Sequence, residues 1–289
     1  MHTNPTISVI TPSFNQAKYI DETLQSVRSQ GYPELEHLVI DGASTDGTVD
    51  LLRRYSSMPA WNYMHWISEP DKGQSDAINK GFRMATGDII GWLNSDDLFE
   101  PNCFRAIMRV FESRPDVDFV YGDYRIMDSA GKTIILKREI DFDWNIMLCG
   151  LNYIAQPNVF FRRRVFDKLG YLNQSLHYVM DYEFWLRAAS NGFRFHHVAQ
   201  TLAACRWHLD AKTVSRDPRI EKELRSVRQQ YWNKHRFHNR FVQNTYERFW
   251  NVRVRASRQW SKLRTRHAMD IVPASWYLEL WKRRSASGA

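Results

Sequence analysis

The stretch GWLNSDDLFEP, from Gly91 to Pro101, passes directly from apolar residues to two adjacent carboxylates, Asp96 and Asp97. Like charges this close repel each other unless a positive group lies beside them. A bound cation would account for the pair, and a solvated turn is the simpler alternative. The residues just before it, DIIGWLN (88–94), have the apolar run of a buried strand. The two carboxylates therefore mark the end of a predicted strand.

Upstream of this stretch, strand-like and helix-like segments alternate. Apolar, β-branched runs are each followed by a segment with apolar residues at helical spacing. The predicted strands are 6–12, 37–44, 62–68 and 88–94, and the predicted helices are 16–31, 46–56 and 73–87. This alternation predicts an α/β fold whose mainly parallel sheet is flanked by helices.

The pattern changes after Pro101. It predicts a helix at 102–115, a strand and hairpin at 116–139, a strand at 156–163, a helix at 180–192 and an extended segment at 193–208. From Pro218 onward the sequence predicts long basic helices. We therefore expect one α/β domain over residues 1–217 and a C-terminal α-helical extension over residues 218–289.

Composition limits the class of protein. Hydrophobic residues make up 43% of the 289 residues, which is enough for a large core. The three cysteines, Cys103, Cys149 and Cys205, lack Cys-x-x-Cys spacing, so a reducing cytosol is expected rather than a disulfide framework or zinc cluster. The N-terminus does not have the pattern of a signal peptide, and no apolar run approaches the ~18–20 residues of a membrane span. These features predict a cytoplasmic protein.

Polar residues follow each strand of the first half. The clusters are Pro12-Ser13-Phe14-Asn15, Asp41-Gly42, Glu69-Pro70-Asp71-Lys72 and Asn94-Ser95-Asp96-Asp97. Since the carboxyl ends of parallel strands share one edge of a sheet, the four clusters together indicate a ligand site. Mg²⁺ is typically held by one or two carboxylates plus substrate phosphates, and the last cluster could supply that sparse shell.

Two of these residues could recognise a nucleotide. Asp41 could accept a hydrogen bond from a nucleobase N–H or a ribose hydroxyl, and Phe14 could stack on a base. An aromatic residue at such a position is otherwise as often part of the core. The sequence has neither a Gly-x-Gly-x-x-Gly motif nor a Walker Lys-Ser/Thr motif, which disfavours a dinucleotide-dependent dehydrogenase and a P-loop nucleoside triphosphatase.

Five motifs, taken in order, carry a resemblance to a known family. They are ISVITPSFNQ (7–16), VIDGASTDGT (39–48), SEPDKGQSDAINKG (68–81), ATGDIIGWLNSDD (85–97) and MDYEFWLR (180–187). Together they resemble the inverting family 2 glycosyltransferases, which have the GT-A (Rossmann-like) fold, over roughly Thr6 to Ser215. The resemblance implies a nucleoside diphosphate sugar as donor, Mn²⁺ or Mg²⁺ at an Asp-x-Asp motif, and transfer to an acceptor hydroxyl.

The resemblance implies a donor-binding set, namely Pro12, Phe14, Asp41, Lys72, Asn94 and Ser95. Phe14 would lie against the base and Asp41 on its N–H edge. The Asp-x-Asp motif falls on Asn94-Ser95-Asp96, so Asp96 would be the main metal ligand. Asn94 departs from the family, which has Asp at this position, and its amide adds no charge. Asp97 is therefore expected to share the metal. Lys72 is expected to reach the diphosphate, with a solvated surface lysine as the alternative.

The family also implies a base and a further metal ligand. Its catalytic base is the Asp of an acidic pair that opens a helix, which Asp181 matches, with Met180 where the family often has Glu. The base would take the proton of the acceptor hydroxyl, and the configuration at the sugar would invert. His208 stands where a family histidine completes the metal shell, and a structural histidine is the equal alternative.

The C-terminal extension carries most of the positive charge. Residues 218–289 contain 17 Lys and Arg against 5 Asp and Glu, whereas the whole chain has a net charge of +8. Basic residues interleaved with aromatics could bind an anionic membrane surface. They could instead pack on the catalytic domain or on a second subunit in a homodimer. Nucleic acid is disfavoured as a partner, because residues 1–217 are acidic and lack a nucleic-acid motif.

The sequence thus predicts a metal-dependent inverting glycosyltransferase that is cytoplasmic, or peripheral at the inner face of the membrane. By resemblance it would use a UDP-sugar and a glycan or lipid-linked acceptor, in surface polysaccharide or glycolipid biosynthesis. Guanosine and thymidine remain open as bases. The alternatives are a nucleotidyltransferase on a related scaffold, and a degenerate, non-catalytic sugar-nucleotide-binding protein, which Asn94 and Met180 motivate.

Overall fold

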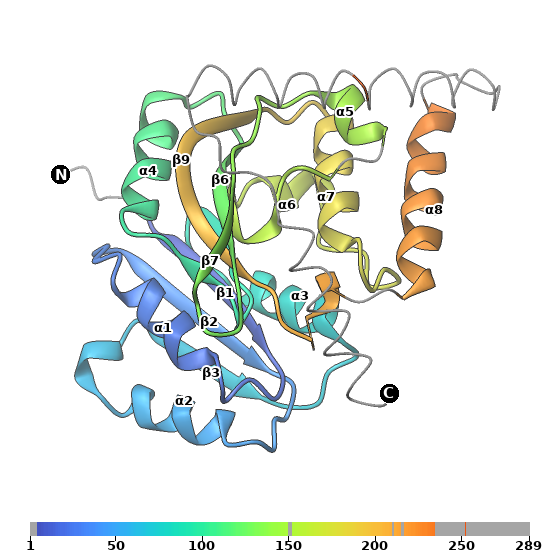
Figure 1. The fold of residues 1–289 in the computed structure, drawn as a ribbon. Helices are drawn as coiled ribbons and strands as arrows, with labels where there is room; N and C mark the ends of the chain where they lie inside the picture. The colour runs from blue at the N-terminus through green and yellow to red at the C-terminus, as the bar shows by residue number, and fades with distance from the viewer. Residues whose placement is uncertain (1–4, 150–151, 210, 215–216, 235–251, 253–289) are drawn as a thin grey trace.

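The computed structural model describes residues 5–149, 152–209, 211–214, 217–234 and 252. The strands in these residues form one curved sheet in the order β3-β2-β1-β4-β8-β6-β9-β5, with β7 paired to β6. Figure 1 shows helices on both sides of it. The strands are β1 (Ile7–Ser13), β2 (Leu35–Asp41), β3 (Met64–Ser68), β4 (Ile89–Trp92), β5 (Leu98–Phe99), β6 (Phe119–Met127), β7 (Thr133–Lys137), β8 (Val159–Arg162) and β9 (Phe195–Arg206).

Helices connect and cover these strands. The α-helices are α1 (Ile20–Arg28), α2 (Thr48–Ser56), α3 (Gln74–Met84), α4 (Cys103–Ser113), α5 (Trp144–Leu148), α6 (Val165–Leu169), α7 (Met180–Ser190) and α8 (Pro218–Lys234). Short 3₁₀ turns are η1 (Pro59–Trp61), η2 (Gln156–Asn158) and η3 (Lys212–Val214). No helix of the described residues is both long and apolar enough to cross a bilayer.

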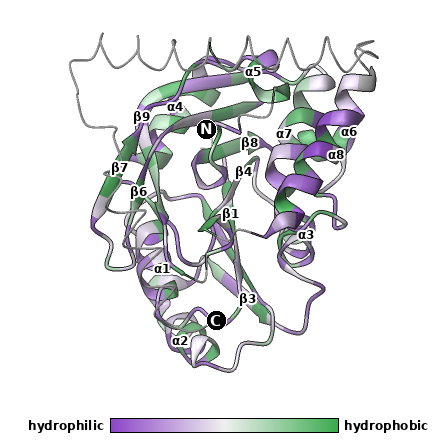
Figure 2. Cartoon of the chain, turned by 45° about the vertical axis from the view of Figure 1, so that its right-hand side comes forward, coloured by the Kyte–Doolittle hydropathy of each residue, from purple (hydrophilic) through white to green (hydrophobic). Residues whose placement is uncertain are grey.

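The first half of the sheet is parallel. Strands β3, β2, β1 and β4 pair in one direction, which confirms the predicted α/β fold. Every residue of β1 is buried, as expected for a strand covered on both faces. Ile7 and Val9 pack in the cluster under α4, whereas Ile10 packs in the cluster under α3. Figure 2 shows the hydrophobic colour along β1.

The second half of the sheet is mixed. Strand β8 is antiparallel to β4 and β6, the predicted hairpin joins β6 to β7, and β9 is parallel to β6. The last residues of β9 pair with β5, which begins one residue after Asp97. This pairing brings the segment that follows β9 to the tip of β4.

Helix α8 packs on the core of the sheet domain. Its Val227, Tyr231 and Trp232 are buried in the same cluster as Trp185 of α7. The Tyr231 hydroxyl donates to Glu183 at 3.1 Å. The first part of the predicted extension, α8, therefore packs on the sheet domain. The domain boundary after residue 217 stays a prediction, and the basic segment beyond Lys234 lies outside the described residues, apart from Val252.

We expect Trp232→Ala to lower the free energy of unfolding by about 3–5 kcal/mol, because it removes a buried aromatic side chain and leaves a cavity. Urea unfolding of the full chain measures this. Gln230→Ala, at an exposed position of the same helix, is the matched control and should stay within about 0.5 kcal/mol of wild type. An unchanged midpoint for Trp232→Ala would mean that α8 does not contribute to the core.

Candidate active site

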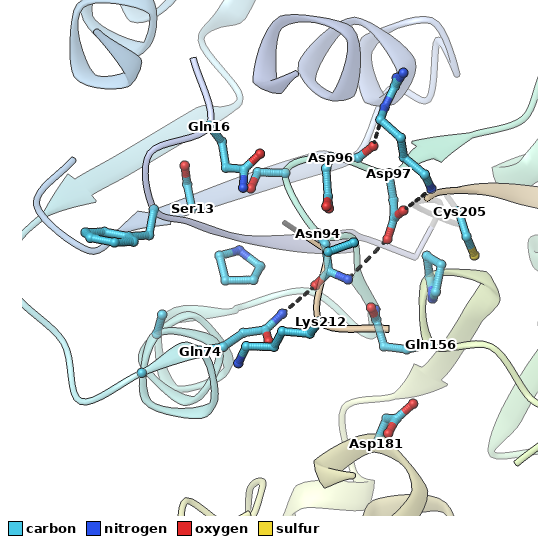
Figure 3. Close-up of a pocket in the computed structure, with 18 of the residues that line it drawn as sticks. Ser13, Gln16, Gln74, Asn94, Asp96, Asp97, Gln156, Asp181, Cys205 and Lys212 are labelled. Carbon is cyan, nitrogen blue, oxygen red and sulfur yellow. Dashed lines mark hydrogen bonds between the residues drawn. The ribbon is translucent and has the colours of Figure 1, made fainter. Parts of the chain in front are cut away.

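A cavity of about 710 Å³ opens at the carboxyl ends of the four parallel strands. Its walls come from the residues that follow these strands, from the first turns of α3 and α7, and from the segment after β9 (Figure 3). Ligands of α/β sheets bind at this edge. Of the residues predicted from the sequence, those on the wall are Pro12, Phe14, Asn94, Ser95, Asp96, Asp97 and Asp181.

One end of the cavity is shaped for a flat ring. Phe14 is 60% exposed and presents its ring to the cavity. Gly42 lies beneath it, and a Cβ there would come within 3.3 Å of the Phe14 ring and 2.6 Å of Asp71 Oδ2. A side chain at position 42 would therefore collide with the carboxylate. An exposed aromatic ring beside such a gap can stack on a nucleobase.

Asp41 lies behind this wall. Its side chain is fully buried and accepts hydrogen bonds from the Ser44 amide at 2.9 Å, the Ser44 hydroxyl at 2.5 Å and the Ser68 hydroxyl at 2.7 Å. These bonds join the loop after β2 to the end of β3. The contact of Asp41 with a base therefore stays a prediction. Asp71, which accepts from the Gly73 amide at 2.7 Å, is the carboxylate on the wall beside Gly42.

Asn94 lies at the centre of a hydrogen-bond network. Its Oδ1 accepts from Gln74 Nε2 at 3.0 Å and from Trp92 Nε1 at 3.1 Å. Its Nδ2 donates to Asp97 Oδ2 at 3.1 Å. The other Asp97 oxygen accepts from the Arg206 amide at 2.9 Å. The amide at position 94 thus supplies a donor that a carboxylate could not.

Asp97 is an internal residue. Only 6% of it is exposed, and burial followed by the charge of Asp96 raises the pKa of its carboxyl well above the usual range. It borders the cavity, but its oxygens are directed at Asn94 and Arg206. Metal binding by Asp97 stays a prediction. The orientation of its carboxylate does not favour it.

Asp96 is paired with His208. The distance from His208 Nε2 to Asp96 Oδ2 is 3.0 Å, and the histidine ring packs on Tyr19 with centroids 4.9 Å apart. Arg206 also donates to the Asp96 carbonyl at 3.0 Å. The segment after β9 therefore brings His208 to Asp96, two of the three residues that the sequence predicted as metal ligands.

Asp181 faces the cavity from the first turn of α7. Asn152 Nδ2 donates to its Oδ2 at 3.2 Å, and the Tyr182 amide donates to its Oδ1 at 2.7 Å. Burial outweighs these bonds and raises the pKa of the carboxyl to about 6. The nearby Glu183 is directed away, toward Arg187 and Tyr231. Asp181 is thus a carboxylate with raised basicity on the wall of the cavity.

Comparison with known proteins agrees with this geometry. Residues 8–170 match the family described as Glycosyl transferase family 2. The chain belongs to glycosyltransferase family 2. An uncharacterized glycosyltransferase of Mycobacterium tuberculosis is 34% identical over 191 residues, which cover 65% of this chain and 71% of that protein. A Bacillus subtilis relative, provisionally named for teichuronic acid biosynthesis, is 32% identical over 44% of this chain and 50% of its own length.

Two solved structures share the GT-A architecture of this glycosyltransferase. TarS residues 1–349 of S. aureus, in complex with UDP-GlcNAc, superpose with a TM-score of 0.61 at 19% identity. The match covers 77% of this chain and 65% of the TarS fragment. The mannosyltransferase PcManGT of Pyrobaculum calidifontis, in complex with GDP-Man and Mn²⁺, gives 0.58 at 18% identity over 99% of this chain and 81% of its own. At these identities the likeness shows the fold alone.

Sequence reasoning missed a cation on the cavity wall of this glycosyltransferase. Lys72 is exposed and does not line the cavity, whereas Lys212 does (Figure 3). Burial lowers the pKa of Lys212, and its Nζ donates to the His177 carbonyl at 3.4 Å. Gln16, Gln74, Asn152 and Gln156 also line the cavity and were not predicted. The only sequence signal for Lys212 was its place four residues after His208.

The donor atoms fit a divalent cation that is shared with a diphosphate. Within the described part of the chain, no cluster of three or more His, Cys, Asp or Glu side chains forms a complete metal cage. Asp96 and His208 supply one carboxylate and one imidazole, 3.0 Å apart. Mg²⁺ needs only one or two protein ligands when phosphates and waters complete its shell. Asp96, on the cavity wall, and His208, buried beside it and not on the wall, are the residues that could hold such an ion.

We expect Asn94→Asp to destabilise the glycosyltransferase, although it restores the family's acidic residue. The new carboxylate would replace the donor at 3.1 Å from Asp97 and repel it when both are ionised. Because the pKa of Asp97 is already raised, the loss in thermal midpoint should grow as the pH rises from about 5 to about 8 and the second of the two carboxylates loses its proton. Asn94→Ser, which brings no charge, is the control. A loss in Asn94→Asp that does not change with pH would contradict this explanation.

Proposed function

We propose that this glycosyltransferase is a metal-dependent, inverting enzyme. It would move a sugar from a nucleoside diphosphate sugar, most simply a UDP-sugar, to an acceptor hydroxyl in surface polysaccharide or glycolipid assembly. One observation supports it above the others: Asp96 and Asp181 line the same cavity, and Figure 3 shows them on opposite sides of it. Inversion requires this arrangement, because the nucleophile must approach the sugar from the side opposite the departing diphosphate.

Asp181 has the chemistry of the general base. An ordinary Asp, with a pKa near ~3.9, takes a proton poorly from a hydroxyl. Burial raises the pKa of Asp181 to about 6, so it is more basic and yet still ionised at neutral pH. The Asn152 amide holds Oδ2 at 3.2 Å. Asn152 therefore fixes the orientation of the carboxylate that would receive the proton.

The departing diphosphate needs positive charge as it leaves. A divalent cation held by Asp96 and His208 would supply charge neutralisation as a Lewis acid. Lys212 would add a second positive charge from the cavity wall. Burial lowers its pKa, whereas the partial exclusion of water strengthens the attraction of the ammonium to a diphosphate. Gln74, held by Asn94 at 3.0 Å, lines the same part of the cavity.

The structural neighbours support a nucleotide sugar but leave the base open. TarS is described with UDP-GlcNAc and PcManGT with GDP-Man. The Asp71 carboxylate has one oxygen occupied by Gly73, so it suits the single N–H of uracil or thymine better than the two donors of guanine, and we favour uridine by family resemblance. The role in surface polysaccharide follows from the Bacillus subtilis relative's name alone. Attachment to an anionic membrane surface and a homodimer are proposed for residues 218–289, of which those beyond Lys234, apart from Val252, lie outside the described residues.

We expect Asp181→Asn to lower kcat by about 10²–10⁴-fold, because a general base contributes on this order. In wild type, kcat/KM should rise as the pH passes through about 6, where Asp181 loses its proton, and level off above it. The variant should lose this rise while it still binds UDP and Mn²⁺. The formation of labelled product from a labelled UDP-sugar measures these rates.

Stability provides a second measurement for this variant. A folded-state pKa raised above the unfolded value means that stability falls as the pH rises between 3.8 and about 6. Asp181→Asn removes this cost, so its thermal midpoint should equal or exceed that of wild type above pH 6. Loss of UDP binding in a folded Asp181→Asn protein would show that the residue belongs to the donor site instead.

We expect two lysines to differ in their effect on nucleotide binding. UDP with Mn²⁺ should raise the thermal midpoint of wild type, because a ligand of the folded state stabilises it. Lys212→Met should reduce this shift, since it removes a cation from the cavity wall, and Asp96→Ala should abolish it. Lys72→Met is the matched control and should behave as wild type.

Parallel scans with GDP and thymidine diphosphate, each with Mn²⁺ and with a chelator, test the base and the metal. No shift with any nucleotide would favour the degenerate, non-catalytic alternative. The reverse order of the two lysine variants would restore Lys72 as the diphosphate contact.

A further inference from the structure

A carboxylate from α8 holds the segment that leads into α7. The two oxygens of Glu223 accept hydrogen bonds from the His177 amide at 2.9 Å, the Tyr178 amide at 2.8 Å and the Val179 amide at 3.2 Å. Val179 is the residue before the first turn of α7, and Asp181 is the second residue of the helix. The three bonded amides therefore lie immediately before Met180, the first residue of α7, and two to four residues before Asp181.

Glu223 acts as a side-chain acceptor at the N-terminal end of α7. The first N–H groups of a helix point outward without intrahelical acceptors, and a side chain at the N-cap normally satisfies one of them. The N-cap of α7 is Val179, whose side chain cannot accept a hydrogen bond. Glu223, from a different helix, accepts instead from the Val179 amide and from the two amides before it, and a negative charge at a helix N-terminus is also electrostatically favourable.

The segment before α7 is also hydrogen-bonded to side chains of α3 and to Lys212, which lie on the side of the cavity proposed to bind the sugar donor. Asn79 of α3 exchanges two hydrogen bonds with the backbone of Leu172, each 2.9 Å, and Ser75 of α3 donates to the Leu176 carbonyl at 3.2 Å. Lys212 donates to the His177 carbonyl at 3.4 Å. Residues 172–179 are thus held by α3 on one side and by α8 on the other. The place of Asp181 relative to Asp96 depends on both sets of bonds.

We propose that Glu223 is a positioning residue for Asp181, so that α8 belongs to the machinery of transfer. The inference rests on the proposed function, in which Asp181 is the base. A base must lie within hydrogen-bond reach of the hydroxyl it deprotonates. Misplacement of a reacting group by about 1 Å can cost on the order of 10²-fold in rate. Without Glu223 the amides of His177, Tyr178 and Val179, which lead into the first turn of α7, would lose their side-chain acceptor.

Glu223→Ala and Glu223→Gln in the full chain test the proposal. We expect kcat to fall by about 10²-fold in Glu223→Ala and less in Glu223→Gln, which keeps one accepting oxygen. The affinity for UDP with Mn²⁺, measured by calorimetry, should stay near the wild-type value, because the residues proposed for the base and the cation follow β1 to β4 or β9 and do not belong to the segment that Glu223 holds. Hydrogen exchange of amides 177–182 should accelerate in Glu223→Ala without any substrate present.

Two variants of the same helix serve as controls. Glu221→Gln changes an exposed carboxylate paired with Arg225, and it should leave rate, binding and exchange unchanged. Val227→Ala shortens a buried side chain of α8 and should lower the thermal midpoint. It should not change kcat at a temperature where the protein is fully folded. Glu221→Gln tests whether the loss of a negative charge on α8 is enough to lower the rate. Val227→Ala tests whether a general loss of stability is enough. An effect found only in the Glu223 variants would therefore come from the displacement of Asp181.

Three outcomes overturn the proposal. One is unchanged exchange at residues 177–182 in Glu223→Ala. Another is a fall in kcat that Val227→Ala reproduces at equal stability. The third is a loss of UDP binding in proportion to the loss of rate. If Asp181→Asn retains wild-type turnover, the proposed function itself fails and the positioning role falls with it, so the two failures are distinguishable.

Discussion

The desolvation of one carboxylate, Asp181, is the constraint on which the site depends. Burial raises its pKa to about 6, and the hydrogen bonds from Asn152 and the Tyr182 amide limit that rise. A higher pKa would leave the group protonated in neutral solution, and an ordinary one would leave it a weak base. The wall around α7 therefore has to exclude water without removing every donor. The segment before this helix is held separately, by hydrogen bonds from α3 and α8.

The departure at position 94 follows from a similar constraint at the tip of β4. Two adjacent aspartates cannot both face a ligand without strong repulsion. The fold separates them, since Asp97 is buried against the Arg206 amide and Asp96 lies on the cavity wall beside His208. A buried Asp97 needs a donor, and Asn94 provides it at 3.1 Å. The amide is therefore matched to the local structure and is not by itself a sign of lost activity.

The sequence predicted the parallel half of the fold because its signals are local. Alternating apolar runs and helical spacing defined β1 to β4, and turn residues marked the edge where the cavity opens. The mixed half was harder, since the pairing of β9 with both β6 and β5 joins segments far apart in the chain. Pairings of this kind leave no periodic signal in either segment.

The same distinction applies to individual site residues. Phe14, Asp96 and Asp181 each lie within a recognisable motif, and all three line the cavity. Lys212 was missed because a loop after β9 brings it there, whereas Lys72 in a quoted motif remains exposed. Asp41 is bonded to Ser68, 27 residues away, and no local pattern predicts that its carboxylate is already occupied. Partners of buried polar groups are long-range properties, and sequence motifs report only the residue types.

Helix α8 changes how the basic extension should be understood. The sequence separated residues 218–289 by charge, because Lys and Arg are frequent there. The structure joins α8 to the core through Val227, Tyr231 and Trp232, and joins it to α7 through Glu223. Its charged residues, such as Arg219, Lys222 and Arg225, are exposed, so one helix combines an anchoring face with a basic face. A surface or partner that bound the basic face would therefore act on a helix whose other face holds the start of α7.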